Sequence, residues 1–262
     1  MATAYERVRI ARGAKRPTGM DYLQNVFHGF FELHGDRRYA DDPAIVGGLA
    51  YLGATPVTVI AIEKGHTAKE RVQRGFGAPQ PEGYRKALRL MRQAEKFHRP
   101  VVCFVDTSGA GCNVGAEERG QGEAIAECLT TMSALQTPVL SILIGEGGSG
   151  GALALAAGDR VWMLENAVYS VISPEGCATI LWKDAAKAEQ AAEELKLTAD
   201  DALALGVVES VIPEAGLGEL EFYDALSQRL MREIDALTEM PIQELLSARY
   251  ARFRRFGGEA QA

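Results

Sequence analysis

Residues that commonly hold metals or move protons are scarce in this sequence. It contains four histidines and four cysteines in 262 residues. The cysteines have neither C-x-x-C spacing nor a histidine cluster near them, and they lie at Cys103, Cys112, Cys128 and Cys177. Such spacing does not build a zinc ribbon, and it is typical of free thiols in a reducing compartment. We therefore expect no metal in this chain.

Long apolar runs are absent as well. No run approaches the roughly 20 residues that a membrane helix needs. No secretory signal peptide is visible, because the basic N-terminus lacks an apolar stretch. A net charge of −7 argues against a general nucleic-acid-binding protein. We expect a cytoplasmic protein that binds neither membranes nor nucleic acid.

A regular alternation of strand and helix patterns is present. Apolar, β-branched segments occur at residues 56–62, 101–105, 139–144 and 167–172. A helix with one apolar stripe is predicted to begin at Pro81, and a second helix is expected from about Glu117 to Leu135. Residues 217–256 have the pattern of amphipathic helices. This order predicts an α/β protein built from βαβ units with right-handed crossovers.

The most informative segment is a glycine run that follows the third apolar strand. Five of the seven residues from Gly145 to Gly151 are glycine, and an Ala/Leu segment comes next. Glycine lets a ligand approach the main chain, and the first amides of a helix are unpaired donors. The run is therefore the expected place to hold an anion or a developing negative charge, unless the glycines only let a helix pack close to its strand.

Three chemical motifs fit this run. The residues from Gly145 to Gly150 match the G-x-G-x-x-G dinucleotide pattern, with Glu165 as a candidate ribose acid. The residues around Ser149 match G-x-S-x-G, the nucleophile elbow of α/β-hydrolases. The third interpretation uses only backbone N–H groups, which would form an oxyanion hole.

Chain order and spacing favour the oxyanion hole. The nucleophile elbow requires a histidine after the serine, but all four histidines precede Ser149. The dinucleotide motif normally lies in the first βαβ unit, whereas at least two predicted strands precede this run. In addition, the spacing from Gly151 to Asp159 is too short for the usual crossover helix.

A second glycine-rich loop strengthens this interpretation. The segment DTSGAGCNVG, from Asp106 to Gly115, directly follows the predicted strand at 101–105. Ligands of parallel sheets bind outside the carboxyl ends of the strands. Amides from the two loops are therefore expected to converge on one oxygen atom.

Positive charge is concentrated in one part of the chain. Residues 64–99 contain ten Lys/Arg and three acidic residues. Arg85, Arg89 and Arg92 have helical spacing that predicts one exposed face. This face is either a solvated surface or a binding surface for phosphates or an acidic partner.

Long motifs make the sequence resemble a known family, the α subunits of the carboxyltransferase component of bacterial acetyl-CoA carboxylase. The resemblance extends from about Arg16 to Phe256. The stretches that carry it are LHGDRRYADDPAIVGGLAYL (Leu33–Leu52), APQPEGYRKALRLM (Ala78–Met91), GAEERGQGEAIA (Gly115–Ala126), IGEGGSGGALAL (Ile144–Leu155) and VISPEGCATILWKD (Val171–Asp184).

The resemblance implies a crotonase-like α/β fold of repeated ββα units with a helical C-terminal extension. It implies one domain over residues 1–262, with an N-terminal helical segment at 1–32 and C-terminal helices at 217–256. One oxyanion donor would be Gly109 or Ala110 and the other Gly150 or Gly151. The expected substrate-binding residues are Gly147 and Gly148, which shape the approach, and Arg85, Arg89 and Arg92.

The implied reaction transfers CO₂ from carboxybiotin on a biotin carrier protein to acetyl-CoA, which gives malonyl-CoA for fatty acid synthesis. The implied partners are a zinc-containing β subunit in a heterotetramer, the carrier protein and biotin carboxylase. The resemblance is also taken to imply ATP binding and nucleotide binding. The alternatives are a self-sufficient acyl-CoA hydratase or decarboxylase of the crotonase type, or a non-catalytic paralogue. A hydratase is expected to place a carboxylate within residues 152–157, where this sequence has none.

The first loop departs from the family pattern. Members usually have T-P-G-A-Y-P-G where this chain has TSGAGCN, so that Gly111 replaces an aromatic residue and Asn113 replaces a glycine. The lost ring is expected to remove packing near the biotin pocket, and the added glycine is expected to loosen the loop.

Overall fold

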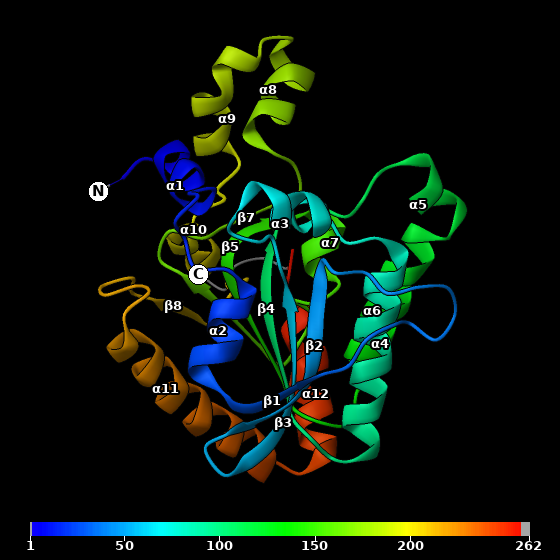
Figure 1. Cartoon of the computed structure of the whole chain (residues 1–262). Coiled ribbons are helices and arrows are strands. Elements are labelled where there is room, and N and C mark those ends of the chain that lie inside the picture. The colour runs from blue at the N-terminus through cyan, green and yellow to red at the C-terminus, as the bar shows by residue number, and fades with distance from the viewer. Residues whose placement is uncertain (1, 258–262) are drawn as a thin grey trace.

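The computed structural model describes residues 2–257, so residues 1 and 258–262 of the expected domain lie outside the described part. These residues build one eight-stranded sheet in the order β1-β2-β3-β4-β5-β6-β8, with β7 paired to β5 (Figure 1). The first three strands are antiparallel, and the others run parallel to β3. The strands are β1 (His28–Glu32), β2 (Ile45–Leu52), β3 (Thr55–Ile62), β4 (Val101–Thr107), β5 (Val139–Gly148), β6 (Arg160–Leu164), β7 (Val168–Ser170) and β8 (Ser210–Ile212).

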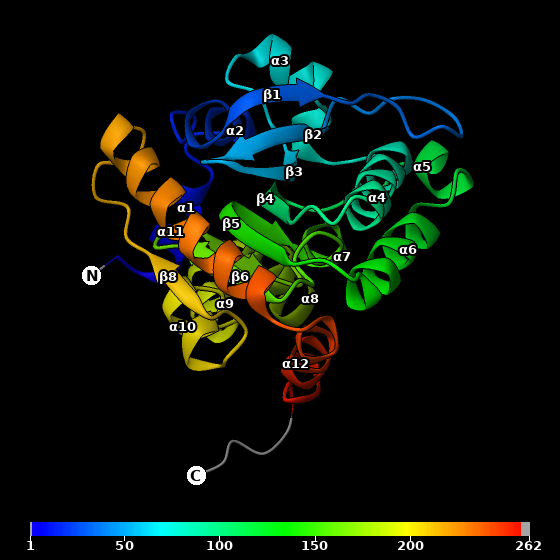
Figure 2. The ribbon, with the colours of Figure 1, turned by 90° about the horizontal axis from the view of Figure 1, so that it is seen from below.

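Helices cover both faces of the sheet (Figure 2). Helices α4 (Pro81–Lys96) and α6 (Gln121–Ala134) lie side by side on one face, and α2 (Gly19–Val26) and α11 (Leu220–Glu239) lie together on the other. The C-terminal helix α12 (Ile242–Arg254) packs against α6. The remaining helices are α1 (Ala4–Ala11), α3 (Ala68–Gln73), α5 (Val114–Glu118), α7 (Ser149–Leu153), α8 (Pro174–Trp182), α9 (Ala188–Glu194) and α10 (Ala199–Ala204), with short 3₁₀ turns at Gly75–Gly77 and Ala185–Lys187.

The sequence patterns account for the central layers. Every residue of β4 is buried, as expected of a parallel strand that is covered on both faces. The amphipathic pattern predicted for residues 217–256 is present in α11, whose apolar stripe is buried from Tyr223 to Leu237, although Leu220 at the start of the helix is 69% exposed. Helix α8 begins after Ser173, whose hydroxyl caps the helix by accepting the amide of Gly176.

Other boundaries differ from the sequence predictions. The helix expected from Glu117 to Leu135 is two helices, because Gly120 adopts a left-handed conformation with φ 82° between α5 and α6. The segment 1–32, which was expected to be helical, contains α1 and α2 but ends in β1. The strand expected at 167–172 is limited to β7.

Strands β1, β2, β6 and β8 were not among the predicted strands. In β2 the pair Gly47-Gly48 interrupts the side-chain pattern that marks a strand. The structure gives the reason, because a Cβ atom on Gly48 would lie 2.0 Å from the carbonyl oxygen of Phe31. The glycine lets β1 approach β2 closely.

The N-terminal segment crosses the carboxyl edge of the sheet. Helix α1 packs against α9, which forms a projection with α8 at the top of Figure 1. Farther along, Arg16 donates from Nε to the carbonyl oxygen of Ile144 in β5 (2.6 Å) and forms an ion pair with Glu214. These contacts hold the segment over the ends of β4 and β5, where the glycine loops lie.

Candidate functional site

The two glycine-rich loops meet at the carboxyl ends of β4 and β5. A Cβ atom on Gly148 would lie 2.2 Å from the carbonyl oxygen of Ser108, and one on Gly151 would lie 2.5 Å from the amide nitrogen of Ala110. Real Cβ atoms do not approach so closely, so only glycine allows this contact between the two main chains. The structure thus brings together the candidate donor regions at 109–110 and 150–151.

The four candidate donor amides differ in what they already bind. The Gly109 amide donates to Thr107 Oγ1 at 3.0 Å. Among the described residues the Ala110 amide has no protein acceptor. Gly150 and Gly151 lie in the first turn of α7, where amides have no acceptor within the helix. Gly151 is buried, whereas Gly150 is partly exposed.

Ser149, the first residue of α7, has an unusual backbone conformation. Its φ of +53° lies in the left-handed region, which non-glycine residues rarely adopt. The residue is exposed, and among the described residues its hydroxyl makes no hydrogen bond to a histidine. The strained backbone of Ser149 fits a nucleophile elbow, but the serine lacks the histidine base that would activate it as a nucleophile.

Hydrogen bonds anchor the first loop at its extra glycine, and the expected loosening of the loop stays a prediction. The Gly111 amide donates to the carbonyl oxygen of Pro79, and Gln121 Nε2 donates to the carbonyl oxygens of both Gly111 and Pro79. A Cβ atom on Gly111 would lie 2.2 Å from Gln80 Nε2, so the side chain of Gln80 occupies the space beside it. Asn113 caps α5 by accepting the amide of Ala116.

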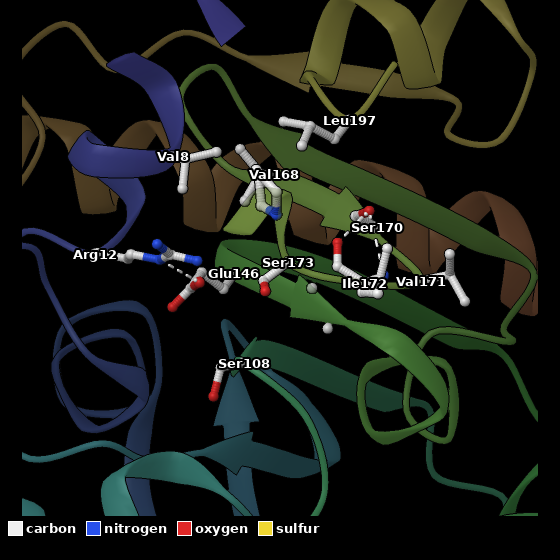
Figure 3. A pocket seen from close by; sticks show the side chains of 13 residues that line it. Val8, Arg12, Ser108, Glu146, Val168, Ser170, Val171, Ile172, Ser173 and Leu197 are labelled. Carbon is white, nitrogen blue, oxygen red and sulfur yellow. Dashed lines mark hydrogen bonds and ion pairs between the residues drawn. The ribbon is translucent and has the colours of Figure 1, made fainter. Parts of the chain in front are cut away.

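A pocket opens beside the second glycine run (Figure 3). It lies between α1, the end of β5, β7 and the start of α8, and apolar side chains such as Val8, Val168 and Leu197 form one side. Gly147 and Gly148 line it, as expected for residues that shape the approach. The four candidate donors are not among its lining residues.

An ion pair divides this pocket from a second, more polar one. Arg12 Nε lies 2.7 Å from Glu146 Oε1, and both residues line both pockets together with Ser108. The second pocket has a volume of about 220 Å³ and is lined by Lys64, Arg71 and Phe76, among others. The candidate site thus consists of an apolar pocket and a charged pocket, with the ion pair between Arg12 and Glu146 separating them.

The three arginines of α4 do not share one exposed face, so that prediction is wrong for Arg85. This side chain is buried, with Nε 2.7 Å from Asp36 Oδ2 and a second ion pair to Glu82. Sequence spacing places residues on a face but does not reveal what covers it, and here the loop that carries Asp36 does so. Burial raises the pKa of Asp36, but backbone amides and Arg85 outweigh it and leave the pKa below its usual value.

Arg89 and Arg92 remain at the surface and line a hollow of about 340 Å³ with Arg37 and Arg38. Arg89 donates only to the carbonyl oxygens of Gly35 and His34, so no carboxylate neutralises it among the described residues. Burial and the nearby charge of Arg37 lower the pKa of Arg89. The hollow therefore carries net positive charge.

Comparison with known proteins places these features in a family. A family model described as "Acetyl co-enzyme A carboxylase carboxyltransferase-like" matches residues 1–257. The acetyl-coenzyme A carboxylase carboxyl transferase subunit alpha of Ruminiclostridium cellulolyticum is 58% identical over 255 residues, which cover 97% of this chain and 98% of that protein. The chain belongs to the acetyl-CoA carboxylase carboxyltransferase family. Its function is that of the family's alpha subunit.

Other relatives support the same family assignment for this carboxyltransferase subunit. The alpha subunit of Clostridium acetobutylicum is 54% identical over 259 residues, which cover 97% of this chain and 94% of that protein. A protein of Natranaerobius thermophilus named for subunits beta/alpha is 54% identical over 259 residues, and the match spans 43% of its length. This chain is therefore a subunit of the acetyl-CoA carboxylase complex, and the fused relative implies a beta subunit as its partner.

Solved structures confirm the predicted crotonase-like fold. The transcarboxylase 12S structure gives a TM-score of 0.72 at 19% identity and covers 88% of this chain and 44% of that one. A Pseudomonas malonate decarboxylase heterotetramer gives a TM-score of 0.67 at 17% identity and covers 91% of this chain and 98% of that one. The carboxyltransferase subunit therefore has the mixed α/β fold that the motifs implied, with C-terminal helices.

The comparisons favour the carboxyltransferase over a self-sufficient hydratase or decarboxylase and over a non-catalytic paralogue. They do not support ATP binding by this subunit. Residues 2–257 contain no cluster of three potential metal ligands and no helix that is long and apolar enough to cross a membrane. Burial raises the pKa of both Cys103 and Cys128 to about 12, so these thiols stay protonated.

Sequence reasoning missed one group of residues beside the glycine run. Lys64, which follows β3, forms ion pairs with Asp106 at the end of β4 and with Glu146 in β5. Each of these residues lies one or two positions after the end of a predicted strand, and that position was the available signal. Their pairing depends on the register between β4 and β5, which the sequence does not show.

Proposed function

We propose that this subunit, bound to a beta subunit in a heterotetramer, transfers CO₂ from carboxybiotin to acetyl-CoA to give malonyl-CoA. The carboxybiotin arrives on a carrier protein that biotin carboxylase has loaded, and the reaction takes place in the cytoplasm. In this proposal the main-chain amides of the two glycine loops bind the ureido oxygen of biotin as negative charge develops on it.

The observation that carries the proposal is the contact between the loops. The main chains of Ser108–Ala110 and Gly148–Gly151 approach closely enough that a Cβ atom at Gly148 or Gly151 would collide with the other loop. Fixed donors that are aimed at a developing charge stabilise a transition state without reorganisation. Two loops that are locked together meet this requirement better than one flexible loop.

Hydrogen bonding and burial together guide the choice among the four candidate donors. We assign the first donor to Ala110 rather than Gly109, because the Gly109 amide already donates to Thr107. We assign the second to Gly150 rather than Gly151, because Gly151 is buried and packs against the first loop. Gly147 and Gly148 then form the wall along which biotin approaches.

The reaction develops two anions, one on biotin and one on the acetyl thioester. In this proposal the two loops supply one set of amides, so we assign the biotin anion to this subunit and the thioester enolate to the beta subunit. The fused beta/alpha protein supports this division, since it links both parts in one chain. The zinc expected in the complex belongs to the beta subunit in this scheme.

Arg89 and Arg92 provide a second element of the proposal. We assign to them the attraction of an anionic partner, either the phosphates of CoA or an acidic carrier, because their hollow has excess positive charge. We assign a structural role to Arg85 instead, because its guanidinium forms ion pairs with Asp36 and Glu82.

Malonyl-CoA formation from carboxybiotin and acetyl-CoA tests the division of labour. The chain alone is expected to form no product, and activity is expected to appear when a beta subunit is added. Substantial product from the chain alone would refute the proposal.

A proline substitution tests the Gly150 donor in the assembled enzyme. Gly150→Pro removes an amide that has no intrahelical acceptor, at a first-turn position where helices tolerate proline. We expect kcat to fall by about 10²- to 10³-fold. Folding and association with the beta subunit are checked first, and a normal kcat in the assembled variant eliminates this donor.

A further inference from the structure

The end of β5 is displaced from the regular register of the sheet. Val105 of β4 pairs with Leu143, but the next pair is Thr107 with Gly147, so β4 advances by two residues while β5 advances by four. The irregularity coincides with a change of neighbour, because β5 pairs with β6 up to Leu143 and with β7 from Glu146. Such a bulge bends a strand and redirects the residues that follow it, which here are the glycine run.

The carboxylate of Asp106 fills this bulge. It is buried and accepts the amide of Glu146 at 2.7 Å, which is a hydrogen bond that the regular ladder does not provide at this position. A Cβ atom on Gly145 would lie 2.3 Å from Asp106 Oδ1, so the carboxylate lies directly against the main chain of β5. A side chain of β4 therefore replaces a backbone acceptor and defines the path of β5.

Lys64 holds this carboxylate in place. Its Nζ atom lies 2.6 Å from Asp106 Oδ1 and 3.2 Å from Glu146 Oε2, so one ammonium group joins the ends of three strands. Its side chain is 18% exposed, and its stem packs against Gly77, where a Cβ atom would lie 2.5 Å from Lys64 Cγ. Burial lowers the pKa of Lys64, but the two carboxylates outweigh it and raise the pKa, which keeps the group charged.

We propose that Lys64 is a positioning residue for the carboxyl transfer: it fixes Asp106 in the β5 bulge and thereby aims the amides of Gly147–Gly151. Lys64 itself touches no reacting atom in this scheme. The inference rests on the proposed role of the glycine run. It adds that the orientation of the amides in this run depends on a charged side chain that follows β3. A misplacement of about 1 Å can cost about 100-fold in rate, so a modest shift of the bulge is enough to reduce catalysis.

Three variants test this role in the complex with the beta subunit. Lys64→Met removes the charge and keeps most of the stem, which leaves the Asp106 carboxylate without its lysine. Asp106→Asn retains an oxygen acceptor for the Glu146 amide, and the double variant combines both changes as a neutral pair. Lys69→Met on α3 is the matched control, because Lys69 is exposed and has no ion pair among the described residues.

We expect Lys64→Met to lower kcat by about 10- to 100-fold with little change in the KM for acetyl-CoA. The double variant is expected to recover part of this loss, because it leaves no unpaired buried charge. Asp106→Asn alone is expected to be milder than Lys64→Met, and it preserves the test if Lys64→Met does not fold. The control is expected to keep the wild-type kcat.

Amide hydrogen exchange over residues 144–151 supplies a readout that does not depend on activity. Faster exchange in Lys64→Met, together with a lower kcat, supports the inference. Unchanged exchange overturns it, even if kcat falls, because the bulge then does not depend on Lys64. Faster exchange with a normal kcat also overturns it, and in addition counts against the glycine run as the site of catalysis.

Discussion

Arg249 of α12 forms a bidentate ion pair with Asp159, although the two residues are far apart in sequence. Its Nε and Nη2 atoms each lie 2.7 Å from one oxygen of the carboxylate. The remaining donors of the guanidinium reach the carbonyl oxygens of Met132, Leu135 and Thr137, and both ionic side chains are at most 2% exposed. This arrangement joins the C-terminal helix to the end of α6 and to the start of β6.

Removal of Arg249 should therefore destabilise the fold. Arg249→Met leaves Asp159 buried without its partner, and such losses cost about 3–5 kcal/mol. The free energy of unfolding measured in urea checks this value. Arg254→Met, on the same helix but exposed, should change stability by less than about 0.5 kcal/mol. Equal changes in the free energy of unfolding for the two substitutions would show that the buried ion pair does not stabilise the fold more than an exposed arginine does.

Two glycines of the run should respond very differently to alanine. Gly148→Ala drives a Cβ atom into the backbone of Ser108, so we expect loss of stability and of kcat. At Gly150 the nearest atom to a new Cβ is Ile125 Cγ2 at 3.8 Å, an ordinary contact, and the amide is retained. Gly150→Ala should thus keep most of the stability and kcat. Thermal unfolding and steady-state rates of the assembled enzyme measure both, and a harmless Gly148→Ala would contradict the close approach of the loops.

Neutralising the exposed arginines should weaken the binding of an anionic partner. For Arg89→Gln or Arg92→Gln we expect KM to rise about fivefold, which equals the roughly 1 kcal/mol of one charge contact in water. The wild-type rate at low substrate should fall as salt is added. Lys69→Gln, which removes a charge from α3, is the matched control and should leave KM unchanged. A flat salt profile and an unchanged KM in all variants would leave a solvated surface as the explanation of the cluster.

Ser149 allows a test of backbone strain and of covalent catalysis at one position. Ser149→Gly removes the cost of the left-handed conformation, about 1–2 kcal/mol, so the melting temperature should rise. Ser149→Val should lower it, because β-branched residues tolerate positive φ poorly. Ser149→Ala should keep most of kcat, since no histidine activates the hydroxyl among the described residues. An inactive but folded Ser149→Ala enzyme would reopen the case for a serine nucleophile.

Sequence reasoning located the layers and the two loops but not their fine geometry. The strands around Phe104 and Ile142 were predictable because both faces are buried and the segments are largely apolar. The bulge at Asp106 was not, because register is a property of two paired strands. The burial of Arg85 was missed for a similar reason, since the loop that covers it comes from a distant part of the chain. Likewise, glycine content identified both loops, but only the hydrogen bond of Gly109 shows which amide is occupied.

The close packing of Gly148 and Gly151 against the first loop has a consequence for the way the enzyme responds to pH. Peptide N–H groups neither gain nor lose protons in the range where proteins are folded, so donors such as Ala110 and Gly150 keep the same strength in acid and in base. In the proposed scheme the donors themselves therefore add no titration to the rate profile. A bend in the rate profile then reports the substrates, the partner subunit or the ionic contacts of Lys64 beside the glycine run, rather than the peptide donors.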